Sequence, residues 1–190
     1  YKIDWEAKDA TAKKSNYTVS ESVGTLSVTR NTAGIVLTAP DAQKVYDGEP
    51  LKAEGKASCE GLPEGMDYSV KLAGSRTKAG TGESTIESYS ITNADGEDVT
   101  DFFRGVSTVS GKLIVTKAPL IVSTGSASKI YDGKSLTNDE TDIKGLVGEE
   151  KIKVEVTGKQ KEVGNSDNTF TIDWLRANKD NYELTEVPGT

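Results

Sequence analysis

The sequence predicts an all-β protein built from tandem modules, and three observations support this prediction. Runs rich in β-branched residues alternate with short turn sequences, and residues 152–156 (Ile-Lys-Val-Glu-Val) show the period of two that is typical of a half-buried strand. A set of short motifs recurs along the chain at a nearly constant period. Leu, Ile, Val and Phe make up only about 21% of the chain, close to the level below which charged chains stay unfolded. We therefore expect small modules with thin cores.

Composition excludes several classes of function. The chain has 23 Lys and Arg against 30 Asp and Glu, a net charge of −7 that would repel nucleic acids and anionic lipids. It contains no histidine and one cysteine, Cys59, so histidine-based catalysis, histidine-zinc sites and internal disulfides cannot form. No apolar run is long enough to span a bilayer, and residues 1–14 lack the apolar segment of a signal peptide. We expect a protein that is not an enzyme, with no cofactor, no metal and no membrane insertion in this segment.

The repeat is defined by an ordered set of motifs. Lys-x-Tyr-Asp-Gly-x-x-Leu occurs at residues 44–51 and again at 129–136, a shift of 85 between the two tyrosines. Each copy is followed by Gly-Leu, at positions 61 and 145, and a closing Leu-x-Val-Thr-Lys/Arg block occurs at 26–30 and 113–117. The motif residues are Tyr46, Asp47 and Gly48 in one copy and Tyr131, Asp132 and Gly133 in the other.

A second comparison sets the phase of the repeat. Ile-Asp-Trp followed by Asn-Tyr occurs near both ends of the chain, with the aromatic residues Trp5 and Tyr17 in the first copy and Trp174 and Tyr182 in the last. Residues 1–30 are therefore interpreted as the C-terminal part of a preceding repeat. Residues 31–117 form a complete repeat, and residues 118–190 form a second repeat that lacks its final strand.

The expected elements are mostly strands. Residues 24–29 and 111–116 have the same Gly-x-Leu-x-Val-Thr pattern and should form strands that close a module. Short helical pieces are expected only at residues 6–14 and 175–179. The junction between repeats should be an extended linker at residues 116–120, where Pro119 fixes its own φ and donates no backbone hydrogen bond.

We expect each module to be a small antiparallel β-sandwich of immunoglobulin-like type, with a β-grasp-like module as the alternative. An unfilled strand position in the last repeat would be a pairing site, so residues 24–29 should either add to the last repeat of another molecule or pack on the complete repeat.

The ordered motifs resemble the YDG and MBG families of repeat modules, which occur in tandem in large bacterial surface proteins with adhesin-like character. The likeness extends over nearly the whole chain, although the complete repeat has Asp-Phe-Phe at residues 101–103 where the other repeats have Asn-Tyr. The resemblance implies an extracellular all-β module attached to the bacterial cell surface and used as a stalk element. The resemblance implies no catalytic residues.

The motif aromatics have two interpretations. Tyr46 and Tyr131 could stack on glycans, but a tyrosine at the same phase of a thin-cored module is better explained as core with its hydroxyl bonded to the backbone. Trp5 and Trp174 are likewise expected to pack against their own modules. The Asp-Gly pairs are expected to form turns.

Other polar residues are also expected to have structural and not functional roles. The loop at residues 93–101 carries several oxygen ligands and could hold calcium, but its spacing is not that of an EF-hand, and a solvated hairpin loop is favoured. The acidic residues at 139–142 and at 149–150 are expected to line a wet edge. Cys59 aligns with Ile143 and is expected to be a buried, inert thiol. A Lys-Asn crosslink, for instance between Lys44 and Asn93, is disfavoured.

The predicted function is a non-enzymatic structural stalk that projects a binding or anchoring region away from a bacterial cell wall. The alternative is an adhesin module that binds a glycan or a host protein through a site the sequence does not identify. Strand-mediated self-association is the remaining partner expectation.

Overall fold

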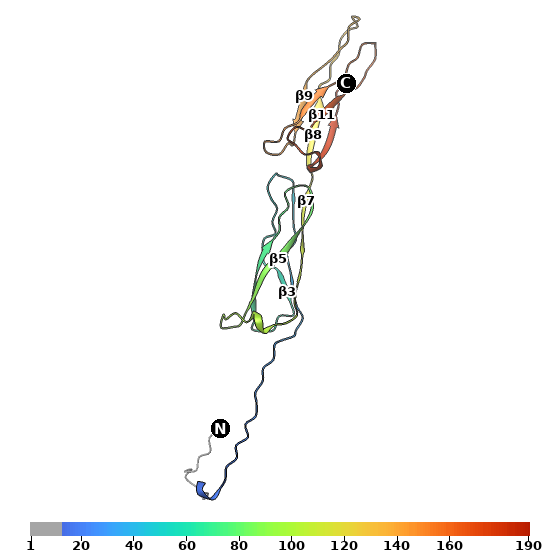
Figure 1. Ribbon diagram of the computed structural model, residues 1–190. Coiled ribbons are helices and arrows are strands. Elements are labelled where there is room, and N and C mark those ends of the chain that lie inside the picture. The colour runs from blue at the N-terminus through green and yellow to red at the C-terminus, as the bar shows by residue number, and fades with distance from the viewer. Residues whose placement is uncertain (1–12) are drawn as a thin grey trace. The chain divides into compact units, whose positions relative to one another are not determined.

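The computed structural model describes residues 13–190 (Figure 1). Contacts within the chain separate Tyr1–Arg30 from one compact unit, Asn31–Thr190. Trp5 and most of the helix expected at residues 6–14 lie outside the described residues. We call residues 31–117 the first repeat and residues 118–190 the second repeat.

Strands are the main regular structure of the described residues, so the all-β prediction is confirmed, and their only helical pieces are three short 3-10 turns. The first repeat contains β1 Ile35–Thr38, β2 Ala42–Val45, β3 Ser58–Glu60, β4 Asp67–Ala73, β5 Gly80–Thr92, η2 Thr100–Phe102, β6 Val106–Val109 and β7 Gly111–Thr116. The second repeat contains β8 Ala118–Thr124, β9 Thr141–Lys144, β10 Lys153–Val156, β11 Phe170–Asp173, η3 Lys179–Asn181 and β12 Tyr182–Val187, while η1 is Lys14–Asn16.

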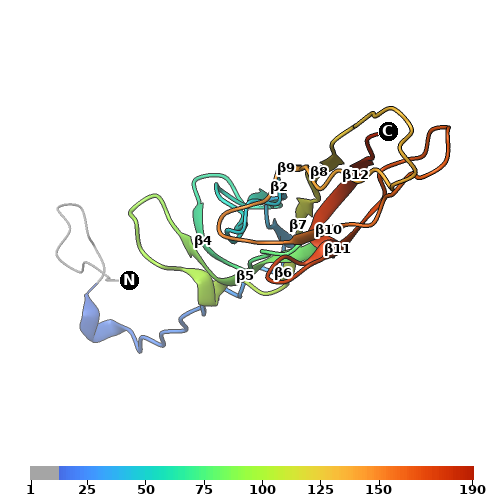
Figure 2. The same ribbon diagram turned by 90° about the horizontal axis from the view of Figure 1, so that it is seen from above.

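The strands form four small sheets. In the first repeat their orders are β3-β1-β6 and β2-β7-β5-β4, and in the second they are β12-β8-β9 and β10-β11. The two repeats use equivalent pairings, because β1 lies between β3 and β6 as β8 lies between β9 and β12. Figure 2 shows the second repeat from above, with β12 beside β8.

The expectation of purely antiparallel sheets is wrong, because the first repeat contains two parallel pairs and the second contains one. β1 pairs with β6, β2 with β7, and β8 with β12 in parallel register. A parallel pair needs a long connection between its strands, and here an early strand of each repeat pairs with a late one. This arrangement brings the start and the end of each repeat together, which local patterns do not reveal.

The Gly-Leu motif marks a close approach between backbones. A Cβ atom added to Gly61 would lie 2.3 Å from the carbonyl oxygen of Gly34, and one added to Gly145 would lie 2.1 Å from that of Pro119. Both glycines also have positive φ, 78° and 101°. Glycine is therefore required at this point of both repeats by space and by backbone conformation.

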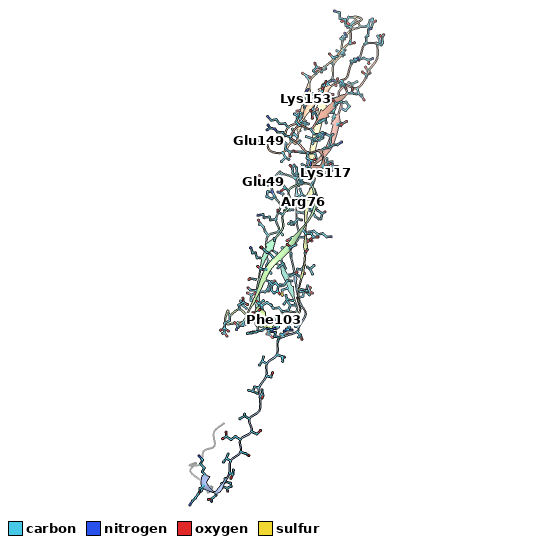
Figure 3. All side chains as sticks on the ribbon, in the orientation of Figure 1. Glu49, Arg76, Phe103, Lys117, Glu149 and Lys153 are labelled. Atoms are coloured by element: carbon cyan, nitrogen blue, oxygen red, sulfur yellow. The ribbon has the colours of Figure 1, made fainter. Side chains whose placement is uncertain are left out.

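The connection between the repeats is shorter than the five-residue linker predicted at residues 116–120. β7 ends at Thr116 and β8 begins at Ala118, so only Lys117 lies between them (Figure 3). Pro119 lies within β8 and pairs with Glu183 of β12. The last strand of the first repeat thus continues almost directly into the first strand of the second.

Two clusters of buried apolar residues form the core. One, built on Ile35, Leu37 and Ile91, lies within the first repeat. The other combines residues of both repeats: Tyr46 and Val115 from the first, and Ala118, Leu120, Val122, Ile152 and Tyr182 from the second. The core of the second repeat therefore extends across the junction.

Two element predictions are wrong. Residues 24–29 lie outside every strand, and Leu26 and Val28 are each 100% exposed, because no strand among residues 13–190 pairs with this segment. Residues 175–179 form a turn followed by η3, and Leu175 has a φ of 25° that does not fit an α-helix. By contrast, β7 covers the predicted residues 111–116, and β10 lies within the predicted strand at 152–156.

Candidate functional site at the junction of the repeats

The junction is organised around Tyr46, which directly follows β2. Its backbone N–H donates to the carbonyl oxygen of Thr116 at 2.8 Å, which attaches the residue to the end of β7. Its side chain is only 7% exposed, so its interpretation as a core residue is confirmed. The expected partner of its hydroxyl is wrong: the group donates to Oε1 of Glu150 at 2.6 Å, in the second repeat, and not to backbone.

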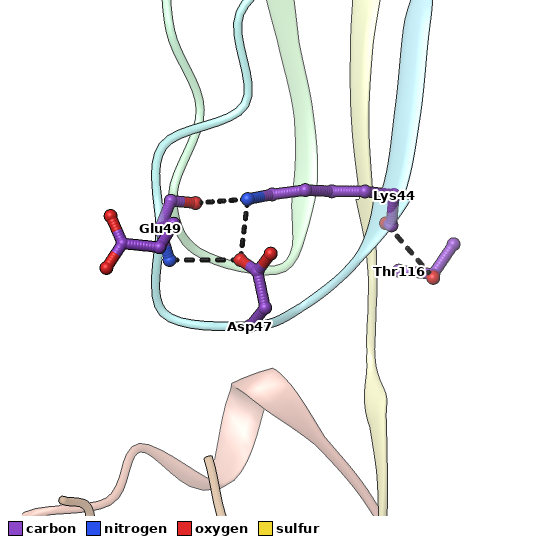
Figure 4. A network of polar contacts seen from close by, with 4 residues as sticks. All are labelled: Lys44, Asp47, Glu49 and Thr116. Carbon is purple, nitrogen blue, oxygen red and sulfur yellow. Dashed lines mark hydrogen bonds and ion pairs between the residues drawn. The ribbon is translucent and has the colours of Figure 1, made fainter. Parts of the chain in front are cut away.

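The turn after Tyr46 is held by a small polar network (Figure 4). Oδ1 of Asp47 accepts a hydrogen bond from the backbone N–H of Glu49 at 3.0 Å, the pattern by which aspartate stabilises turns. Nζ of Lys44 donates to the same oxygen at 2.5 Å and to the carbonyl oxygen of Glu49 at 2.6 Å. The Lys44 ammonium and the backbone N–H together lower the pKa of Asp47. Gly48 has a φ of 84°, as expected for an Asp-Gly turn.

In the second repeat, a carboxylate and a second tyrosine contact the side chain of Tyr46. Glu150 accepts hydrogen bonds from the hydroxyls of both Tyr46 and Tyr182. The hydroxyl oxygen of Tyr182 in turn accepts the backbone N–H of Val147 at 3.0 Å. The two rings meet edge to face, with centroids 5.7 Å apart and planes at 83°, a favourable geometry for aromatic pairs. We call Tyr46, Glu150 and Tyr182 the junction triad.

The electrostatics of the triad favour protonated tyrosines. The hydrogen bond to Glu150 and, secondly, burial raise the pKa of Tyr46. Burial is the main cause that raises the pKa of Tyr182, followed by its hydrogen bond to Glu150. Both effects penalise a phenolate beside a carboxylate in a site with little access to water.

A second polar contact crosses the junction. Oδ1 of Asn181, a side chain only 3% exposed, accepts the backbone N–H of Ala79 at 3.0 Å. Asn181 ends η3, and this short turn begins where Oδ1 of Asn178 accepts the N–H of Asp180. The Asn-Tyr motif therefore supplies two junction residues in succession, Asn181 and Tyr182.

The other predicted aromatics divide into packed and exposed residues. Trp174 is half-buried and packs on Tyr182 with centroids 6.1 Å apart, so its packing against its own repeat is confirmed. Tyr17 is 59% exposed and follows η1. Phe103 follows η2 as Tyr182 follows η3, and it packs on the core of the first repeat.

Tyr131 is 58% exposed, so its interpretation as a core residue is wrong. Its turn nevertheless shares two bonds with that of Tyr46, from the lysine and from a backbone N–H to the aspartate, while the lysine bonds a carbonyl oxygen one position later. Nζ of Lys129 donates to Oδ1 of Asp132 at 2.7 Å and to the carbonyl oxygen of Ser135 at 3.4 Å, and the N–H of Lys134 donates to Asp132 at 3.0 Å. Gly133 has a φ of 74°. Tyr46 is buried by groups of the second repeat, whereas no equivalent groups among residues 13–190 cover Tyr131.

Two of the junction groups were missed by sequence reasoning. Glu150 was expected on a wet acidic edge, but it is half-buried and accepts two hydrogen bonds. The alignment of Gly61 with Gly145 places Glu150 at the position of the apolar Met66, and this mismatch was the available signal. The hydrogen bond from Ala79 to Asn181 was not predicted, because the Asn-Tyr motif was used only to align the repeats.

The remaining candidate sites have local structural roles. In the loop at residues 93–101, Oδ1 of Asn93 accepts the N–H groups of Asp95 and Glu97, as in a hydrogen-bonded turn. Within residues 13–190, no three acidic or cysteine side chains gather into a metal-binding group. Cys59 is only half-buried, and burial raises the pKa of its thiol. Lys44 bonds to Asp47, and the side-chain N–H of Asn93 donates to Glu97, so these two side chains have partners other than each other.

Comparisons with protein-family models, with curated proteins and with solved structures find no match. None of the helical segments in the described part of the chain is long and apolar enough to cross a membrane.

Proposed function

We propose that this chain is a non-enzymatic spacer of a bacterial cell-surface protein, in which small β modules hold a binding or anchoring region away from the cell wall. The observation that supports it most is the junction triad. A spacer needs successive modules that cannot swing freely, and here a one-residue connection is combined with a core and hydrogen bonds shared by both repeats.

The proposal includes the identity and architecture of the modules. We place them among YDG/MBG-type repeats with immunoglobulin-like sandwiches, with a β-grasp-like module as the alternative. The support is local: the Tyr-Asp-Gly turns of both repeats have the same lysine and backbone bonds, and Leu51 bridges to Arg76 as Leu136 bridges to Gln160.

Small-angle scattering tests the spacer. Pro119 is the second residue of β8 and lies two residues after Lys117, the single connecting residue. It restricts its own φ, so Pro119→Gly should loosen the junction and broaden the distribution of interatomic distances. Pro188→Gly, an exposed proline outside the junction, is the control and should scatter like the parent. Identical scattering of the parent and Pro119→Gly would argue against a junction that sets the reach of the protein.

An adhesin module is the second candidate, favoured by the exposure of Tyr131. An exposed tyrosine on an ordered turn is a suitable platform for a sugar ring. A glycan and host-matrix binding screen tests it, with Tyr131→Ala beside the parent. A ligand that binds the parent and is lost in Tyr131→Ala would support the adhesin, whereas the absence of any ligand would leave the spacer as the preferred function.

A further inference from the structure

The initial and final segments of the first repeat run side by side in the same direction. β1 pairs in parallel with β6, and β2 pairs in parallel with β7. Ile35 faces Val106 and Ala42 faces Leu113, so the partners are 71 residues apart in both pairs. Because the register is the same, the parallel contact continues along the repeat while both segments pass from one sheet to the other.

Further hydrogen bonds connect the two segments just beyond the strands. The N–H of Ala39, which follows β1, donates to the carbonyl oxygen of Val109 at 2.9 Å. The N–H of Tyr46, which follows β2, donates to the carbonyl oxygen of Thr116 at 2.8 Å. The hydroxyl of Thr116 also donates to the carbonyl oxygen of Lys44 at 3.3 Å (Figure 4). The parallel contact therefore extends to the last residue of β7.

The point where both segments change sheets is closely packed. A Cβ atom added to Gly111 would lie 2.4 Å from the carbonyl oxygen of Pro40, so the two backbones touch between β1 and β2. Oδ1 of Asp41 accepts the N–H of Lys112 at 2.6 Å. The initial and final segments are thus also joined at the crossing. We call residues 31–46 and residues 103–116, with the bonds between them, the parallel clamp.

The direction of the two segments decides how the repeat responds to a pull along the chain. Asn31, which bridges in parallel to Phe103, begins the clamp at one end, and Thr116 ends it at the other. A pull on both ends of the repeat therefore slides the segments past each other along their own axes. The hydrogen bonds between them then resist together, whereas an antiparallel pair that is pulled from one end opens one residue pair at a time.

The second repeat is loaded in the same way. Only Lys117 separates β7 from β8, so tension passes directly from the final strand of the clamp to the first strand of the second repeat. β8 pairs in parallel with β12, from Ala118 with Tyr182 to Ser123 with Val187. A pull along the chain therefore also slides β8 and β12 in opposite directions.

We propose that the parallel clamp, continued by β8 and β12, is a mechanical element that holds the repeats folded while the chain carries tension. The biological use of this resistance rests on the proposed spacer function, because a spacer between a cell wall and a bound target is pulled from both ends. The resistance itself depends only on the strand arrangement. A mechanically weak repeat would thus overturn this proposal without affecting the scattering test of the spacer.

Single-molecule pulling of the full chain in two directions tests the clamp. Chains with Cys59→Ala carry handles on one of two cysteine pairs. Asn31→Cys/Lys117→Cys loads the clamp along its axis, whereas Asp67→Cys/Thr92→Cys pulls apart residues that face each other at one end of the antiparallel β4–β5 ladder. At the same loading rate, the first pair should need about twofold more force to unfold the repeat, because the second opens its ladder pair by pair. Urea unfolding checks that the two chains are equally stable, and an equal or lower force along the clamp would overturn the proposal.

A matched pair of aspartates tests which bonds resist the force. Asp41 and Asp98 are both exposed, and each accepts a backbone N–H, from Lys112 within the clamp and from Thr100 in the loop after β5. At constant force along the clamp, Asp41→Ala should raise the unfolding rate about tenfold, the effect of one hydrogen bond to a charged group that is broken in the transition state. Asp98→Ala should leave the rate nearly unchanged. No acceleration by Asp41→Ala, or equal acceleration by both variants, would contradict the clamp.

Discussion

At the scale of single residues, Tyr46 and Tyr131 form a natural comparison. Both follow the same lysine and precede the same Asp-Gly turn, yet one is 7% exposed and the other 58%. Tyr46 is buried by groups of the second repeat, among them Glu150 and Tyr182, so the motif alone does not determine whether its tyrosine is buried. This explains why the core assignment succeeded for one tyrosine and failed for the other.

The pair allows a controlled test of the junction triad. Tyr46→Phe removes a hydrogen bond to a carboxylate and should lower the free energy of unfolding by about 1.5 kcal/mol, the lower end for such bonds, because Glu150 keeps Tyr182 as a partner. Tyr131→Phe removes an exposed hydroxyl and should change the free energy of unfolding by less than about 0.5 kcal/mol. Urea unfolding measures both, and equal effects would show that the triad adds nothing to stability.

The raised pKa values of the triad predict a loss of stability in alkali. An unfolded tyrosine loses its proton near pH 10, whereas Tyr46 and Tyr182 keep theirs to higher pH in the folded protein. The folded state then binds more protons than the unfolded state, so the free energy of unfolding falls as pH rises above about 10. Urea midpoints at a series of pH values up to about 11.5 measure this fall.

The control for the alkaline effect is the Tyr46→Phe/Tyr182→Phe variant. It lacks both raised phenols, so its stability should depend less steeply on pH in this range, while all other titrating groups are unchanged. The same slope in the variant and the parent would mean that the triad is not the cause.

At the scale of elements, strand patterns were predictable where a partner strand exists. β7 was predicted at residues 111–116 and occurs there, whereas residues 24–29 have the same pattern and form no strand. Alternating apolar residues make a segment suitable for a sheet, but pairing requires a neighbour, and local sequence does not specify it. The parallel pairing of β2 with β7 was missed for the same reason, since the two strands lie far apart in the sequence.

The glycine of the Gly-Leu motif offers an element-scale prediction. Gly145→Ala should lower the free energy of unfolding by more than about 3 kcal/mol, because the new Cβ would lie 2.1 Å from the carbonyl oxygen of Pro119 and force β8 away from β9. Gly133→Ala also has a positive φ but no heavy atom within 4 Å of the new Cβ, so it should cost only about 1 kcal/mol of backbone strain. Chemical denaturation measures the free energy of unfolding of both variants. Similar losses would mean that the positive φ alone, and not the contact with Pro119, explains why glycine is needed at position 145.

At the scale of the whole molecule, repeat boundaries could be drawn from the sequence, but the way the repeats are joined could not. The shifts of 84 and 85 relate equivalent turns and bridges. The contact between Tyr46 and Glu150 joins positions 104 residues apart, and nothing in one sequence reports such a contact. Glu150 looked like one of many surface acids, and the only local signal against this was its alignment with the apolar Met66, which does not identify Tyr46 as its partner.

The shared core leads to a prediction about cooperativity. Tyr46 and Val115 of the first repeat belong to the same buried cluster as Leu120 and Tyr182 of the second, so neither repeat can unfold without exposing apolar surface of the other. Residues 31–190 should therefore unfold in one transition, with equal calorimetric and van't Hoff enthalpies. Tyr46→Ala removes the ring that crosses the junction, and it should separate the transition into two. Tyr131→Ala truncates the equivalent exposed ring and should keep a single transition. Two transitions already present in the parent, measured by differential scanning calorimetry, would show that the cluster does not couple the repeats.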